Sequence, residues 1–202
     1  MSIVKPLIAA LALAPALALA TTPTFDFYLD GGAGLIDTVG NSQTFASGGI
    51  GLTVTAKQSN GSSAQVANRW DGLGVASSSF LGIPDAGEIV SGESLILTFN
   101  KAVTLTGLQF SLWDRLIDDA TLTVGSKTID LGAASSSGLI INEFSFSNLS
   151  GTQFVIKGNG LLTSFRLAGV TVSPAAVPEP GTWALMGLGL AGLAFARARR
   201  RS

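Results

Sequence analysis

The fold is decided by Ser94-Leu-Ile-Leu-Thr-Phe99, Val103-Thr-Leu-Thr106 and Leu108-Gln-Phe-Ser-Leu-Trp113, three runs that follow one another closely. Each run either alternates between apolar and polar residues or is apolar throughout, and all three contain residue types that favour pleated strands. Asn100-Lys101 separates the first two runs and predicts a turn between them. This stretch therefore predicts successive β-strands and no long helix.

The same pattern continues on both sides of this stretch. Gly125-Ser126 and Gly158-Asn159-Gly160 predict turns, and the Gly/Ser-rich residues 41–49 and 133–138 predict loops. The number and spacing of the strands predict an all-β ectodomain over residues 21–173, with the form of a jelly-roll-like β-sandwich. The further strands are predicted at Phe25–Leu29, Gly51–Ala56, Ala120–Val124, Thr152–Ile156 and Ser164–Val172.

Charge and composition exclude several classes of function for the 202-residue chain. Between Thr21 and Pro180 there are seven Lys and Arg residues against thirteen Asp and Glu residues, a formal charge of −6. No basic run could follow a phosphate backbone, so we expect no nucleic-acid partner. Because Cys and His are absent, disulfides, thiolate nucleophiles, Ser-His-Asp triads and imidazole metal sites are excluded. We therefore expect a protein that is not an enzyme.

Residues 1–20 have the organisation of a secretory signal peptide. Lys5 supplies the positive charge, an apolar stretch begins at about Leu7, and Ala18 and Ala20 occupy the small-residue positions that signal peptidase reads. We expect export through the Sec translocon and cleavage after Ala20. An uncleaved anchor helix is the alternative, but the apolar run is short for a bilayer span.

Residues 174–202 combine a linker with a short membrane segment. Pro178 and Pro180 bracket Glu179, so this part should be extended and exposed. A helix follows over about residues 182–196, whose apolar core of about 14 residues covers roughly 21 Å, less than the hydrocarbon thickness of about 30 Å. The short apolar length of this helix predicts a transient rather than a permanent anchor. The residues expected in the membrane include Trp183, Leu185, Met186, Leu188, Leu190, Leu193 and Phe195.

A basic end follows this helix and predicts its orientation. Positive charge beside a membrane span resists translocation, so the end should remain cytoplasmic and the ectodomain should lie outside. The chain is thus expected to be held briefly at the inner membrane before it reaches the cell surface or the extracellular space. The basic end consists of Arg197, Arg199, Arg200 and Arg201.

The tail resembles the PEP-CTERM sorting domain of Gram-negative bacteria that make extracellular polysaccharide. The resemblance rests on Val177-Pro178-Glu179-Pro180, the apolar helix and the basic end, and it covers about the last 26 residues. It implies that an exosortase-type membrane protease recognises Pro178, Glu179 and Pro180 and processes the tail. It also implies a role in a biofilm matrix, with extracellular polysaccharide as a partner. A plain C-terminal anchor behind a Pro-rich linker is the alternative.

Acidic residues in Gly-rich stretches suggest a structural calcium site, because calcium prefers oxygen ligands on such loops. The candidate ligands are Asp71, Asp85, Glu88 and Glu93. In the alternative interpretation, Asp71 and Asp85 cap turns while Glu88 and Glu93 are solvated, since no EF-hand or nonapeptide spacing is present. Gly72-Leu73-Gly74-Val75, Glu88-Ile89 and the run from Glu93 to Phe99 also resemble a recurring ectodomain type among PEP-CTERM proteins.

Two function classes remain open. The first is a non-enzymatic surface or matrix protein. The second is a secreted carbohydrate-binding or carbohydrate-active protein that uses the region of Asp71, Asp85, Glu88 and Trp113. In addition, Asp114, Asp118 and Asp119 could supply paired carboxylates, and Trp70 and Trp113 could stack on sugar rings. We favour a hairpin turn with a local ion pair to Arg115 for the acids, and core positions for both tryptophans.

Overall fold

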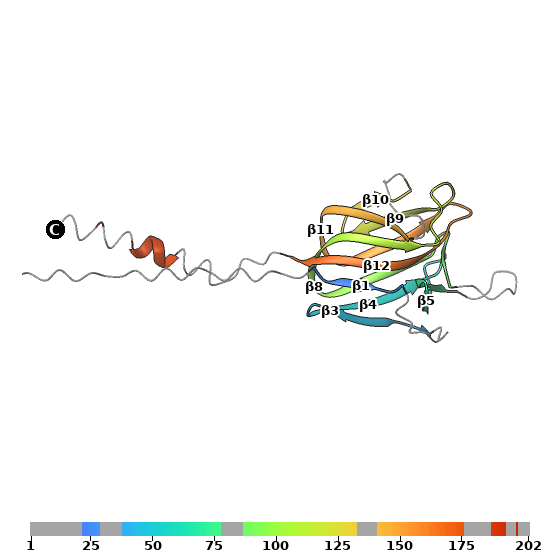
Figure 1. The fold of residues 1–202 in the computed structure, drawn as a ribbon, viewed down its shortest axis with the longest axis horizontal. Helices are drawn as coiled ribbons and strands as arrows, with labels where there is room; N and C mark the ends of the chain where they lie inside the picture. Colours follow the sequence, from blue (N-terminus) through green and yellow to red (C-terminus); the bar gives the residue numbers. More distant parts are fainter. Residues whose placement is uncertain are drawn as a thin grey trace, which may run out of the picture.

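The computed structural model describes residues 22–28, 38–77, 87–132, 141–175, 187–192 and 197, and Figure 1 shows their arrangement. The predicted signal peptide and most of the predicted tail lie outside these residues. Within them the all-β class is confirmed. The strands are β1 (Thr24–Asp26), β2 (Thr38–Gly40), β3 (Gln43–Ser47), β4 (Ile50–Lys57), β5 (Ser63–Arg69), β6 (Gly72–Ala76), β7 (Ile89–Val90), β8 (Ser94–Ser111), β9 (Asp119–Val124), β10 (Lys127–Asp130), β11 (Ile141–Asn159) and β12 (Ser164–Pro174).

The described strands form a sheet that closes on itself. Its order runs β1-β12-β6-β5-β4-β8-β11-β9-β10, and β8 also pairs with β12, so β12, β6, β5, β4 and β8 form a ring of five strands. In Figure 1, β9, β10 and β11 lie towards the top of the view and β3 and β4 towards the bottom. These pairings confirm the strand-rich architecture, and the jelly-roll-like sandwich stays a prediction.

Two long strands make this closure possible. The first part of β8 pairs with β4, from Leu52↔Phe99 to Lys57↔Ser94, whereas its second part pairs with β12, from Pro174↔Val103 to Arg166↔Ser111. β11 follows β8 along both parts, with register shifts at Ser145/Leu149 and Gly151/Gln153. Because such irregularities bend a strand, β8 changes its partner without being interrupted.

Three local predictions are wrong. Asn100-Lys101 lies inside β8, because the bulged partner strand accommodates the bend and no turn is needed. The predicted loop 41–49 contains β3, since Gln43–Ser47 pairs with Ile50–Val54 through a two-residue turn. Asp118-Asp119 does not connect a hairpin, because β11 lies between β8 and β9. The turn at Gly125-Ser126 is confirmed between β9 and β10.

The core follows from the alternation of side chains along the strands. In β4, for example, Ile50, Leu52, Val54 and Ala56 are buried, whereas the residues between them are partly exposed. Aromatic rings fill one part of the core. The Phe110 ring centroid lies 5.3 Å from that of Trp113, 5.5 Å from that of Phe144 and 4.9 Å from that of Phe165.

Candidate functional site

Most of the predicted sorting tail lies outside the described residues. Residues 187–192 are helical, with Leu188 and Leu190 exposed, and Arg197 is exposed as well. Among the described helices, none has both the length and the apolar character needed to cross a membrane. The residues outside the description are Ala18, Ala20, Val177, Pro178, Glu179, Pro180, Trp183, Leu185, Met186, Leu193, Phe195, Arg199, Arg200 and Arg201.

A buried ion cluster lies elsewhere in the domain, around Arg166 of β12. The guanidinium donates through Nη1 to Oδ2 of Asp71, through Nε to the carbonyl of Gly87 at 3.1 Å, and through Nη2 to Oε1 of Glu88 at 3.4 Å. Asp71 is 2% exposed and Arg166 is 7% exposed. Ser164 donates its hydroxyl to the other carboxylate oxygen of Glu88. One cation thus joins three segments that are distant in sequence.

Two glycines allow these segments to approach one another. Gly72 has a φ of 137°, and a Cβ there would lie 2.7 Å from the carbonyl oxygen of Leu167. A Cβ on Gly74 would lie 1.9 Å from the carbonyl oxygen of Gly87. The amide of Val75 donates to the carbonyl of Glu88 at 3.3 Å. The Gly-x-Gly pattern of β6 therefore brings the strand against the Gly87-Glu88 backbone beside Arg166.

The structure describes three of the four predicted calcium ligands, and two of them belong to the Arg166 cluster. Asp71 and Glu88 meet at Arg166, whereas Glu93 accepts a hydrogen bond from the amide of Val90 at 3.2 Å. Asp85 lies outside the described residues. Within the described part of the chain, no three acidic residues are arranged to hold a metal ion. The calcium site stays a prediction, while the contacts of Asp71 and Glu88 show that they neutralise a buried cation.

Sequence reasoning missed Arg166 and Ser164. A signal was present, because Arg166 interrupts the apolar strand Ser164-Phe-Arg-Leu-Ala-Gly-Val170 at a position where a charge needs a buried partner. The partners could not be identified from the sequence, since Asp71 lies 95 residues away from Arg166. The Gly72–Val75 and Glu88-Ile89 elements are separated in the sequence and are neighbours in the structure.

A second acidic group occupies the turn between β8 and β9. Asp118 is 5% exposed and accepts hydrogen bonds from the amide of Asp114 at 2.6 Å and from the amide of Ser164 at 2.8 Å. Burial raises the pKa of Asp118 above its ordinary value, and the nearby charges of Asp114 and Glu88 act in the same direction against the two amide hydrogen bonds. Asp118 therefore ties the start of β9 to the start of β12.

Replacing Asp118 with asparagine should make the free energy of unfolding less dependent on pH. Because the folded pKa is raised above the ordinary value of 3.8, the folded domain holds the proton more tightly than the unfolded chain. The wild-type free energy of unfolding should therefore fall as pH rises through the interval between the two pKa values, and Asp118→Asn should lack this fall. Urea titrations between about pH 4 and pH 7 measure the difference in slope.

Asp130→Asn serves as the control, because it removes an exposed carboxylate from the same part of the domain. Loss of an amide hydrogen bond in Asp118→Asn shifts the whole curve equally at every pH, so the slope is the relevant readout. Equal slopes for Asp118→Asn and the wild type would contradict the role of Asp118.

The two candidate tryptophans occupy different environments. Trp113 is 7% exposed and stacks on Phe110 at an interplanar angle of 21°, so its prediction as a core residue is confirmed. The same prediction is wrong for Trp70, which is 55% exposed at the turn between β5 and β6 and lies 6.0 Å from the ring of Tyr28.

The comparison with known families concerns the tail. Residues 176–201 match the family described as the PEP-CTERM protein-sorting motif. The match spans the Val177–Pro180 motif, the predicted helix and the basic end through Arg201, so the predicted sorting tail of an exosortase substrate is confirmed. No curated protein matches the chain.

Proposed function

Because residues 176–201 match the PEP-CTERM protein-sorting motif, we propose that this exported chain delivers a non-enzymatic β-domain to the cell surface or the extracellular matrix. The signal peptide directs the chain through the Sec translocon, and signal peptidase removes it after Ala20. The C-terminal helix then holds the chain at the inner membrane of a Gram-negative cell. An exosortase-type protease processes the tail and frees the jelly-roll-like domain to join a polysaccharide-containing biofilm matrix.

The connection between domain and tail supports this order of events. β12 pairs with β8 up to Pro174, and the amide of Ala175 donates to the carbonyl of Ala102 at 3.3 Å. Only residues 176 and 177 separate this anchored position from Pro178. The recognition motif therefore begins within about 10 Å of the folded domain, since a strand advances at most about 3.5 Å per residue. Processing at this point removes little besides the tail.

The burial and the hydrogen bonds of two acidic side chains support a non-enzymatic role. Glycoside hydrolysis needs two carboxyl groups about 5–10 Å apart in an accessible cleft. Asp71 is buried against Arg166, and Asp118 is buried against two backbone amides. Each of these carboxyl groups already serves the fold, and the chain has no His or Cys to supply another common catalytic group.

Processing can be tested by following the mass and location of the protein with an internal tag. The exposed Gly125-Ser126 turn accepts an insertion, because the space around Gly125 is open. In cells with the exosortase-type protease, the tagged chain should lose the mass of its tail and leave the inner-membrane fraction. In cells without the protease, or with Pro178→Ala and Pro180→Ala together, it should stay intact and membrane-bound.

Pro174→Ala is the matched control, because it changes an exposed proline just outside the motif. It should be processed like the wild type. If mass and location are the same with and without the protease, the tail acts only as an anchor and the proposal fails.

A further inference from the structure

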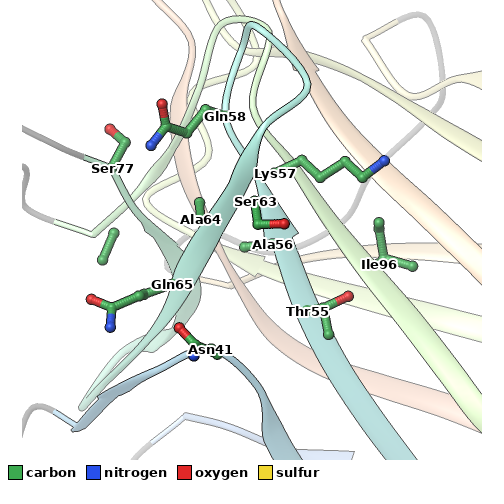
Figure 2. A pocket seen from close by; sticks show the side chains of 11 residues that line it. Asn41, Thr55, Ala56, Lys57, Gln58, Ser63, Ala64, Gln65, Ser77 and Ile96 are labelled. Carbon is green, nitrogen blue, oxygen red and sulfur yellow. The ribbon is translucent and has the colours of Figure 1, made fainter.

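A polar cleft opens where strands β4 and β5 separate. The two strands pair only at Ala56↔Ala64 and Lys57↔Ser63. Beyond these pairs β4 turns to β3, starting at Gln43↔Val54, and β5 turns to β2, starting at Gly40↔Val66. Thr55 pairs with Ile96 of β8 and Gln65 pairs with Ala76 of β6, but in the described pairings neither residue pairs across the gap between β4 and β5. The cleft at this gap has a volume of about 730 Å³, and Figure 2 shows the side chains around it.

The lining combines polar side chains with small apolar surfaces. Three amide side chains and three hydroxyl side chains surround the cleft, and each of them can both donate and accept hydrogen bonds. Ala56, Ala64, Ala76 and Ile96 contribute the apolar surface, and Lys57 is the one charged residue among the lining side chains of the described chain. The six neutral polar residues are Asn41, Thr55, Gln58, Ser63, Gln65 and Ser77.

This lining discriminates between classes of ligand. A metal ion would need carboxylate or carbonyl ligands gathered closely, and among the described residues no carboxylate lines the cleft. A polyanion would find a single lysine in the described part of the cleft. The net negative charge of residues 21–180, formally −6, would oppose its approach. An apolar ligand would leave the amides unpaired. A ligand with many neutral hydroxyl groups satisfies the lining best.

We propose that this cleft binds a neutral saccharide unit. The amides of Asn41 and Gln65 and the hydroxyl of Ser63 exchange hydrogen bonds with sugar hydroxyls, and Lys57 acts as a further donor. The volume lies within the range of about 300–1,000 Å³ that is common for small-molecule sites. This site is distinct from the region of Asp71, Asp85, Glu88 and Trp113 that the sequence suggested for carbohydrate binding, because Asp71, Glu88 and Trp113 do not line the cleft.

The proposed site lies beside the start of β8, and the described domain ends beside a later part of the same strand. Lys57 pairs with Ser94 of β8, whereas the chain leaves the domain at Ala175, which is hydrogen-bonded to Ala102. Ser94 and Ala102 are eight residues apart, about 26 Å along the strand at 3.3 Å per residue. The binding can therefore be measured on the full chain and does not depend on whether processing occurs.

The test uses the full-length chain in a detergent without sugar groups, titrated with neutral hexasaccharides of glucose, mannose or galactose. Hexagalacturonate serves as the acidic counterpart, and isothermal titration with saturation-transfer NMR reports binding. The wild type should bind at least one neutral hexasaccharide saturably, with little dependence on salt. Asn41→Ala combined with Gln65→Ala should weaken that affinity roughly tenfold or more, because it removes two amide partners.

Gln153→Ala is the matched control, because Gln153 is an exposed glutamine on β11, outside the cleft lining. It should bind like the wild type. Ser63→Leu provides a second test, since it adds bulk at an exposed hairpin position and should block the cleft without burying a new group. Absence of saturable binding, binding unaffected by both cleft variants, or salt-sensitive preference for hexagalacturonate would each overturn the proposal.

Discussion

Replacing Arg166 with methionine is expected to lower the free energy of unfolding by about 3–5 kcal/mol. Methionine matches much of the arginine stem in volume but leaves Asp71 as a buried carboxylate without its cation. It also removes the Nε donor to the carbonyl of Gly87, which helps to hold the segment before β7. Removing one member of a buried ion pair is more damaging than removing both, because the remaining charge stays desolvated.

The double variant Arg166→Met with Asp71→Asn should therefore recover most of the lost stability. Glu88 does not prevent this recovery, because its side chain is 24% exposed and can remain hydrated. Lys127→Met, at an exposed position of the β9–β10 hairpin, controls for the loss of a surface positive charge. Urea unfolding measures all three variants. A loss below about 1 kcal/mol for Arg166→Met would contradict a central role for the cluster.

Replacing Gly74 with alanine is expected to reduce stability by about 3 kcal/mol or more, at or beyond the upper end of ordinary overpacking. The new Cβ would lie 1.9 Å from the carbonyl oxygen of Gly87, 2.7 Å from its carbonyl carbon and 3.1 Å from the Cα of Glu88. All three are backbone atoms, so no change of rotamer relieves the clash. The segment must move away from β6 and weaken the hydrogen bonds to Arg166.

Gly107→Ala is the matched control, because Gly107 lies in β8 and the nearest atom to its new Cβ would be 3.5 Å away. This distance is an ordinary contact, and alanine should cost little there. Thermal unfolding followed by circular dichroism compares the two variants with the wild type. Similar melting temperatures for both variants would show that the Gly74 contact does not restrain the domain.

The strand content could be predicted because alternation is a local property. Ile50 to Ala56 of β4 shows its buried face directly in the residue order, and the hairpin turn at Gly125-Ser126 is marked by its own residues. The partners could not be predicted in the same way. The change of β8 from β4 to β12 depends on β11, whose register shifts bend the strand pair and lie tens of residues further along the chain.

The candidate sites show the same difference between what residue types predict and what long-range contacts decide. The acidic residues Asp71 and Glu88 could be identified from their types, but a carboxylate in a Gly-rich loop serves equally as a calcium ligand, a turn cap or an ion-pair partner. Only the position of Arg166 distinguishes among these roles in the structure. The cleft between β4 and β5 was not predicted at all, because amides and hydroxyls gather there from four separate segments.

The sequence by itself determined the sorting tail and the all-β class. Both depend on neighbours in the chain, since Pro178-Glu179-Pro180, the helix and the basic end act as one linear signal, and strand alternation repeats every two residues. The tertiary structure alone decided the Arg166 cluster, the difference in exposure between Trp113 and Trp70, and the polar cleft. These features require residues separated by tens of positions to meet, and pairing over such distances is selected by the packing of the whole domain.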